Sequence, residues 1–500
     1  MDFVAAVLIL FVFYVRPQEI SEVFAGMRPL LLALWFAMFA CLIRPQRIPF
    51  KSLLRTPHDW VFLFYFSWFV YNSFDRWGTF KEFLSSLLIY FFIVQCVTTM
   101  RRVLLFLYIW AGFIFFIAFM AVASEYGFDP TGSHYLTHNF AGGRLIFNTT
   151  MFHNPNALGH NIAPLIPLFY FLLWWRRPVF MKEVALALIA LPVYCVYLTQ
   201  SKGAFIASFV AIVAAMVFGR PKMVQVGMLV LAGTLGVGAL QYLPRFGGFT
   251  PGTARADEAL AGRVRALEFG LKTFRNNPSG VGYKQWLTAM KREHGEELSL
   301  ASHNTYSNVA AEHGWFGLML FLGLLYAGLR TTISARTESD DEERIRRCLF
   351  VLVVTFAVSC WVIDRLYLPN LFMILGAVAA YHRCLMDKNP VATERDPADD
   401  FRAVRPGMQP AAAGAGAGGS RLLGPELAVS QAAAASMGGQ LLQPGRRFAV
   451  AGQAPEAPAK PLLFMPWAWA SALVIGIDIF IIWVGRHGVE RFWEYVIKNA

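Results

Sequence analysis

A histidine-asparagine pair followed by two glycines ends a long polar stretch of the chain. The residues are His303-Asn304, nine intervening positions, then Gly314 and Gly317, in the pattern H-N-x9-G-x-x-G. A neutral imidazole accepts protons near neutral pH, so His303 is a candidate general base for a hydroxyl nucleophile. The plainer alternative is that His303 only caps a helix at a membrane interface.

We expect Ser302 to cap the helix that carries this motif. Residues three and four positions apart then lie on one helical face, within about 40° of one another. Small residues on that face would let a neighbouring helix approach closely, with the imidazole at the outer end of the row. The members of the face are His303, Ser307, Ala310, Gly314 and Gly317.

Two arginines lie in the polar stretch before this histidine. Apolar residues there recur at four- and three-residue spacing and predict an amphipathic helix. Arg263 flanks its apolar face, whereas Arg265 points towards water. An arginine at a protein-facing edge can bind a diphosphate through two parallel hydrogen bonds, and solvation of a charged helix face is the alternative. The apolar residues are Leu260, Val264, Leu267, Leu271 and Phe274.

Two further cations lie at the ends of apolar segments. Lys202 follows Ser201 at the start of one segment, where its ammonium group would neutralise phosphate or anchor the helix end. Arg365 follows Asp364 in a turn between two apolar runs. It would join a binding site or pair with its neighbouring carboxylate.

An asparagine-proline-asparagine element begins another apolar segment. Asn154 and Asn156 flank Pro155, and both side chains are candidates for substrate binding. The same residues also have a structural interpretation, because asparagine is a good helix cap and proline suits the first helical position.

The composition points to a membrane protein. The 500 residues are 56% hydrophobic and 15% charged, whereas soluble domains are about 25% charged. Apolar runs recur along the chain, and we expect an all-α polytopic membrane protein with about twelve transmembrane helices. The predicted spans are approximately 2–15, 29–43, 60–74, 81–97, 103–124, 156–175, 183–200, 203–219, 223–242, 314–330, 348–363 and 367–384.

Lysine and arginine clusters lie in every second loop between these runs. Such clusters mark cytoplasmic loops, so both ends of the twelve-helix core are expected inside. The candidate site residues then share the outer face of the membrane. The clusters are Arg44, Arg47, Lys51 and Arg55; Arg101 and Arg102; Arg176, Arg177 and Lys182; Arg220 and Lys222; and those between Arg330 and Arg347.

The remaining segments divide the chain into three parts. Residues 1–385 form the membrane core, with long outer loops at about 125–155 and 243–303; structureless loops beyond about 15 residues are uncommon unless functional. Residues 386–460 are rich in alanine, glycine and proline and predict a disordered cytoplasmic tail. Residues 461–500 predict one additional transmembrane helix with a short end.

Several other classes are disfavoured by the composition. The net charge of +12 is dispersed among short loops, which argues against nucleic-acid binding. The six cysteines lie in or beside apolar runs at no metal-ligand spacing, so a disulfide framework or zinc site is not expected. No D-x-D element occurs in the predicted outer loops, and we expect neither metal nor cofactor.

The motifs together resemble the O-antigen ligase and polymerase superfamily of bacterial glycan transferases. The H-N-x9-G-x-x-G element matches at each fixed position, and Asn154-Pro155-Asn156 resembles the family's N-P-N element. Other matches are partial: lysine replaces arginine in Ser201-Lys202-Gly203-Ala204, and Ala261 replaces serine before Gly262-Arg263. Residues 278–282 give P-x-G-V-G, one residue shorter than the family's P-x-x-G-x-G. The similarity covers roughly residues 140–385.

The resemblance implies an inverting, metal-independent glycosyltransferase at the outer face of the cytoplasmic membrane. The donor would be a glycan on undecaprenyl diphosphate, and the acceptor would be lipid A core, a glycan or a protein, with polysaccharide-assembly proteins as further partners. His303 and Arg263 would be catalytic; Lys202, Arg265, Asn304, Asn154, Asn156 and Arg365 would bind substrate. A polymerase differs only in acceptor. A transporter or flippase would show mid-helix charges and repeats, and an assembly scaffold would not need His303.

Overall fold

A computed structural model describes residues 1–43, 54–128, 143–240, 254–295 and 300–388. Within these ranges the regular structure is helical, and no strand occurs. The predicted tail and additional C-terminal helix lie outside the described residues. So do Arg44, Arg47 and Lys51 of the first basic cluster.

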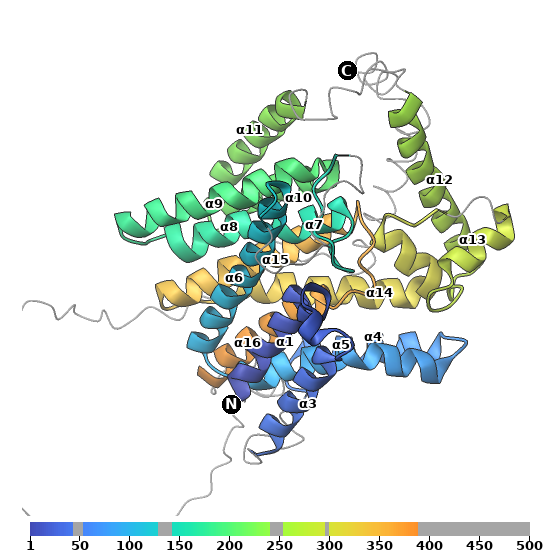
Figure 1. The fold of residues 1–500 in the computed structure, drawn as a ribbon, viewed down its shortest axis with the longest axis horizontal. Coiled ribbons are helices and arrows are strands. Elements are labelled where there is room, and N and C mark those ends of the chain that lie inside the picture. Colours follow the sequence, from blue (N-terminus) through green and yellow to red (C-terminus); the bar gives the residue numbers. More distant parts are fainter. Residues whose placement is uncertain (44–53, 129–142, 241–253, 296–299, 389–500) are drawn as a thin grey trace, which may run out of the picture. The chain divides into compact units, whose positions relative to one another are not determined.

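The helices follow one another along the chain, and the longest connection joins α6 to α7 (Figure 1). Each of the predicted apolar runs coincides with helix, and residues 156–175 correspond to three consecutive short elements. The elements are α1 (Asp2–Val15), α2 (Pro17–Ile20), η1 (Glu22–Phe24), α3 (Pro29–Leu42), α4 (Pro57–Tyr71), α5 (Arg76–Cys96), α6 (Met100–Glu125), α7 (Pro155–Ile162), α8 (Leu165–Phe169), η5 (Tyr170–Trp174), α9 (Val179–Thr199), α10 (Lys202–Val217), α11 (Lys222–Leu240), α12 (Ala254–Asn276), α13 (Trp286–His294), α14 (Thr305–Ser334), α15 (Asp340–Ser359) and α16 (Asn370–Lys388).

Six stretches of the described residues are long and apolar enough to cross a bilayer. Three shorter apolar helices accompany them, namely α3, α10 and residues Lys222–Thr234 of α11. The chain is therefore a multi-pass membrane protein, while a total of twelve crossings stays a prediction. The six stretches are Asp2–Ile20, Arg76–Cys96, Met100–Glu125, Pro155–Trp174, Val179–Thr199 and Thr305–Ser334.

Short polar side chains begin the helices that carry the candidate site. Asn154 caps α7, Ser201 caps α10 and Asn304 caps α14; each side-chain oxygen accepts a hydrogen bond from a backbone N–H of the first turn. These bonds satisfy donors that would otherwise be unpaired at a helix start. The structural interpretation of Asn154-Pro155 is thus confirmed, with Pro155 at the first helical position.

Aromatic rings fill the contact between α4, α5 and α16. The rings of Phe62 and Phe372 lie 4.8 Å apart between centroids, and Phe66 stacks on Phe83 at 5.6 Å. Lipid tails are as apolar as these side chains, so the hydrophobic effect contributes little to helix association in a bilayer. The close ring packing therefore stabilises this part of the bundle mainly through dispersion.

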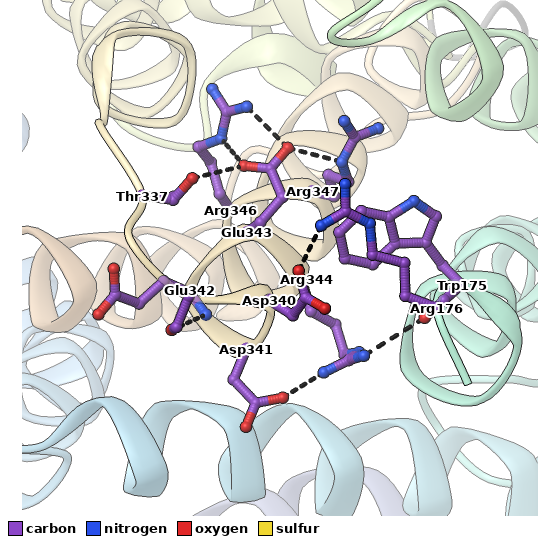
Figure 2. A network of polar contacts seen from close by, with 11 residues as sticks. Trp175, Arg176, Thr337, Asp340, Asp341, Glu342, Glu343, Arg344, Arg346 and Arg347 are labelled. Atoms are coloured by element: carbon purple, nitrogen blue, oxygen red, sulfur yellow. Dashed lines mark hydrogen bonds and ion pairs between the residues drawn. The ribbon is translucent and has the colours of Figure 1, made fainter. Parts of the chain in front are cut away.

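The basic loops meet in a polar network around Glu343 (Figure 2). The Glu343 carboxylate accepts hydrogen bonds from Arg346 Nε at 2.6 Å, Arg347 Nε at 2.7 Å and Thr337 Oγ1 at 3.0 Å. Arg347 also donates to the Phe218 carbonyl at 3.0 Å, at the end of α10. This network joins the start of α15 to a loop that is distant in sequence.

Other contacts connect the remaining basic loops to the same region. Arg344 donates to the carbonyl of Phe171 at 3.0 Å, which links α15 to η5. Lys388 donates to Glu342 at 2.8 Å, and Arg55 donates to Asp387 at 2.6 Å. These contacts bring several of the basic segments together, and the membrane side that they face stays a prediction.

Replacing Glu343 with Gln should destabilise the fold more than replacing Asp340 with Asn. The Glu343 side chain is 13% exposed and holds two arginines, whereas Asp340 is 55% exposed and pairs with the equally exposed Arg176. Hydrogen bonds to partly buried charges contribute about 2 kcal/mol to the free energy of unfolding, whereas exposed ion pairs contribute less than about 1 kcal/mol. Thermal unfolding of the purified variants in detergent measures the difference, and equal shifts in Tm would contradict it.

Candidate active site

Helix α14 is broken at Gly314. The backbone there has φ 67° and ψ −164°, although helix continues on both sides. The break leaves carbonyls of the preceding turn without helical partners, and donors from elsewhere replace those partners. Val281 N donates to the Ala311 carbonyl at 2.9 Å, Gly282 N to the Glu312 carbonyl at 2.8 Å, and Trp68 Nε1 to the His313 carbonyl at 2.9 Å.

The loop at residues 278–282 enters this break, and glycine permits the approach. A Cβ on Gly314 would lie 2.2 Å from the Pro278 carbonyl oxygen, and one on Gly280 would lie 2.3 Å from the Glu312 carbonyl oxygen. Trp315 N donates to the Pro278 carbonyl at 2.9 Å. The P-x-G-V-G element and the G-x-x-G element are therefore two parts of one backbone contact.

His303 precedes α14 and is not part of its face. Asn304 caps the helix, since its Oδ1 accepts from Ser307 N at 2.9 Å, so the expected Ser302 cap is wrong. The His303 backbone is left-handed, with φ 50°. The predicted continuous face from His303 to Gly317 is wrong for the same reason, and also because the helix breaks at Gly314.

A turn after α15 holds the start of α14. Thr305 N donates to the Cys360 carbonyl at 2.7 Å, and Thr305 Oγ1 donates to the Ile363 carbonyl at 2.8 Å. Asn308 Nδ2 donates to Asp364 Oδ2 at 2.7 Å. Backbone strain such as that of His303 persists only where neighbouring contacts hold it. This turn supplies those contacts beside the histidine.

Arg263 acts electrostatically on His303. Burial, and then the positive charge of Arg263, lower the pKa of His303 below its usual value. Arg263 also acts on His160. The arginine side chain is itself exposed, as is Arg265. Arg263 therefore lies close enough to His303 to affect its pKa, and both arginines are accessible to a large ligand.

A second group of site residues surrounds Asn156. Its Oδ1 accepts hydrogen bonds from Arg144 Nη2 at 2.9 Å and Ser201 Oγ at 2.8 Å. Arg144 also donates to the Thr199 carbonyl at 3.0 Å. Lys202, the first residue of α10, is half-buried. Arg144 was missed by the sequence reasoning, because nothing in its local pattern separates it from an ordinary loop arginine.

His160 connects the group around Asn156 with the turn that holds the start of α14. Its Nδ1 lies 2.9 Å from Ser359 Oγ, next to the turn that holds Thr305. A Cβ on Gly203 would lie 2.7 Å from His160 Nε2, so α10 approaches this ring closely. His160 thus brings α7, α10 and the end of α15 together.

Arg365 lies inside this region and not at its surface. The side chain is 4% exposed, and its Nε and Nη2 have no hydrogen-bond partner among the described residues. It borders a cavity of about 20 Å³ that Tyr14, His160 and Asn370 also line. That volume holds about one water molecule and is too small for a phosphate group. The predicted pairing with Asp364 is replaced by contacts of Asp364 with α14.

A buried carboxylate beside the helix break was not predicted. Glu312 is 1% exposed and accepts hydrogen bonds from the backbone N–H of Trp286 at 2.7 Å and Lys284 at 3.2 Å, and from the Tyr367 hydroxyl. Its signal in the sequence is an acidic residue two positions before the apolar run at 314–330. Its partners show that it fastens the segment before α13 to α14.

Residues 185–322 match a family model described as O-antigen ligase. That range contains Lys202, Arg263, His303 and the Gly314 break. No curated protein matches the chain.

The fold is that of a multi-pass membrane protein, and the match supports a role in polysaccharide biosynthesis. Over residues 185–322 the chain is similar to the O-antigen ligase family, which contains glycosyltransferase-like ligases and polymerases. The resemblance based on the sequence motifs is thereby confirmed at the level of the superfamily.

Replacing Gly314 with Ala should destabilise the protein strongly. Alanine would have to adopt the left-handed backbone and displace the Pro278 carbonyl, at a cost of more than about 2 kcal/mol. Gly227 in α11 is the control, because a Cβ there meets no atom within 4 Å. Gly227→Ala should be neutral or stabilise the helix by about 0.5 kcal/mol. Thermal unfolding compares the two, and an unchanged Tm for Gly314→Ala would rule out the broken helix.

Proposed function

We propose that the protein transfers an oligo- or polysaccharide from undecaprenyl diphosphate to an acceptor on the outer face of the cytoplasmic membrane. The observation that carries the proposal is the half-buried His303, held beside the anchored start of α14 and near the exposed Arg263. Lipid A core, another glycan or a protein would be the acceptor. A ligase is favoured over a polymerase because the H-N-x9-G-x-x-G element is more typical of ligases.

The proposed reaction is an inverting displacement without a metal. An acceptor hydroxyl attacks the anomeric carbon, a bond to the new oxygen forms, and the bond to the diphosphate oxygen breaks. His303 accepts the hydroxyl proton, which requires a neutral imidazole. Its lowered pKa keeps the imidazole neutral at physiological pH. Arg263 and Lys202 stabilise the negative charge that develops on the departing diphosphate.

The other candidate residues take supporting roles in this proposal. Asn304 caps α14 and thereby positions His303. Asn156 orients Arg144 and Ser201 next to Lys202. Exposed Arg265 and Asn154 would contact the outer parts of the donor.

Arg365 also has a supporting role. It is buried beside a cavity too small for phosphate, so it would act on the site through its charge.

Loss of His303 should abolish transfer. Cells that lack the chain are complemented with wild type, His303→Ala or His294→Ala at equal expression. The length of glycan on undecaprenyl diphosphate is then measured by mass spectrometry of the lipid fraction. His303→Ala should behave like the deletion, with at least about a hundredfold loss of transfer for a missing general base. His294, exposed on α13, is the matched histidine control.

The accumulated lipid also separates the candidate reactions. Long chains on undecaprenyl diphosphate would identify a ligase, because polymer is made but not passed on. Single repeats would identify a polymerase. No accumulation in the deletion strain would argue against a glycosyltransferase and favour a transporter, and full activity of His303→Ala would exclude this histidine as the base.

Arg263→Gln should shift the pH dependence of transfer. Arg263 lowers the pKa of His303, after burial, so its removal raises that pKa. Since the neutral imidazole is the active form, the acid limb of kcat/KM should move to higher pH. The plateau should fall about tenfold or more, because a charge-assisted bond to the leaving group is lost.

The control for this measurement is Arg275→Gln. Arg275 is an exposed arginine in the last turn of the same helix, α12. Its replacement should leave the acid limb unchanged. An acid limb of Arg263→Gln at the wild-type pH would show that the two side chains do not interact during the reaction.

A further inference from the structure

The buried cation Arg365 has no carboxylate partner in the described part of the chain. Its side chain is 4% exposed, and both Nε and Nη2 lack a hydrogen-bond partner among those residues. The neighbouring Asp364 does not compensate the charge, because its carboxylate oxygens accept from Asn308 Nδ2 at 2.7 Å and from Leu366 N at 3.1 Å. A guanidinium stays protonated in proteins, so a buried one needs a negative charge from another source.

The cavity beside Arg365 is the place where such a charge could lie. Residues of α1, α6, α7, α15 and α16 border it, and none of the described residues that line it is acidic (Figure 1). Tyr14 supplies a further donor. Its hydroxyl oxygen accepts a hydrogen bond from Asn370 Nδ2 at 3.2 Å, which leaves its own hydrogen available to a ligand in the cavity.

A water molecule and an anion would meet different needs in this cavity. Water would accept from Arg365 and also donate to Asn370 Oδ1, which has no partner among the described residues. Water is neutral, however, and leaves the charge of the guanidinium uncompensated. Burial of an unpaired charge costs far more free energy than one unmet hydrogen bond. An anion therefore removes the larger of the two costs.

We propose that this cavity binds one halide ion, chloride or bromide, against Arg365. The volume of about 20 Å³ is that of about one water molecule, and a halide is only slightly larger, whereas phosphate and sulfate are too large. The Nε and Nη2 hydrogens lie on the same edge of the guanidinium and donate two charge-assisted hydrogen bonds to the ion. The Tyr14 hydroxyl donates a third.

The halide site does not depend on the proposed glycan transfer. Its consequence for that reaction concerns the charge of Arg365. A bound halide lowers the positive potential that this arginine exerts on the candidate active site, so the halide concentration adjusts that potential.

Binding of radioactive chloride to the purified protein in detergent tests the proposal. Equilibrium dialysis is carried out in gluconate at constant ionic strength, so that only the identity of the anion changes. Wild type should bind about one chloride per chain, and bromide should displace it whereas sulfate should not. Arg365→Gln should weaken chloride binding at least about tenfold, because two hydrogen bonds from a charged donor are lost.

A second variant removes the space and keeps the arginine. Thr355 lines the cavity, and its Oγ1 donates only within its own helix, to the Val351 carbonyl at 2.7 Å. Thr355→Ile fills part of the cavity and should weaken chloride binding as Arg365→Gln does. Arg344→Gln is the matched control, since this arginine is equally buried but donates to the Phe171 carbonyl at 3.0 Å and the Trp175 carbonyl at 3.3 Å.

Thermal unfolding provides a second measurement and shows which variants fold. Chloride in place of gluconate should raise the Tm of wild type and Arg344→Gln by about 3 °C, and leave the Tm of both cavity variants unchanged. If Arg365→Gln does not fold, Thr355→Ile decides. No chloride on wild type would show that water alone occupies the cavity and would overturn the proposal. Undiminished binding by Thr355→Ile, or loss of binding by folded Arg344→Gln, would overturn it as well.

Discussion

The break in α14 is the constraint on which the rest of the site depends. Within a membrane, backbone carbonyls that leave a helix must find partners inside the protein, because lipid offers none. Residues 281 and 282 and the indole of Trp68 provide those partners for the turn before Gly314. The polar segment between α12 and α13 is therefore fastened to a helix of the membrane core by main-chain hydrogen bonds. Substitutions in this segment would change the core, and substitutions in the core would move the segment.

This attachment positions His303, the proposed base, relative to Arg263, the proposed cation for the leaving group. Arg263 lies on α12, which ends at Asn276, directly before the loop that enters the break. His303 lies at the other end of the nine-residue helix segment that the break terminates, and the turn after α15 holds that end through Thr305. Both groups are thus positioned from one short helical segment anchored at its two ends. Catalytic groups need such rigid support if charge is to be stabilised where it develops.

The sequence was sufficient to predict the elements that local patterns determine. Helices occur at each predicted apolar run, the amphipathic pattern around Val264 forms α12, and Asn154 caps α7 as expected. The Gly314 break was not predicted, because a row of small residues has the same periodicity in a continuous helix as in a broken one. Whether glycine breaks a helix depends on a partner loop more than thirty positions away, which hydropathy does not report. Burial of Glu312 and Arg365 escaped prediction for the same reason, since their surroundings come from other helices.

The contrast between Arg263 and Arg365 argues for a reaction at the protein surface. The proposed lipid-linked donor is large, and exposed or half-buried cations such as Arg263 and Lys202 could meet its diphosphate without rearrangement of the bundle. Arg365 is enclosed beside a cavity of about 20 Å³, so its charge reaches the site only through the surrounding side chains. A buried cation favours anions in the same region. The interior arginine would therefore set the electrostatic potential of the site, while the accessible cations bind the leaving group.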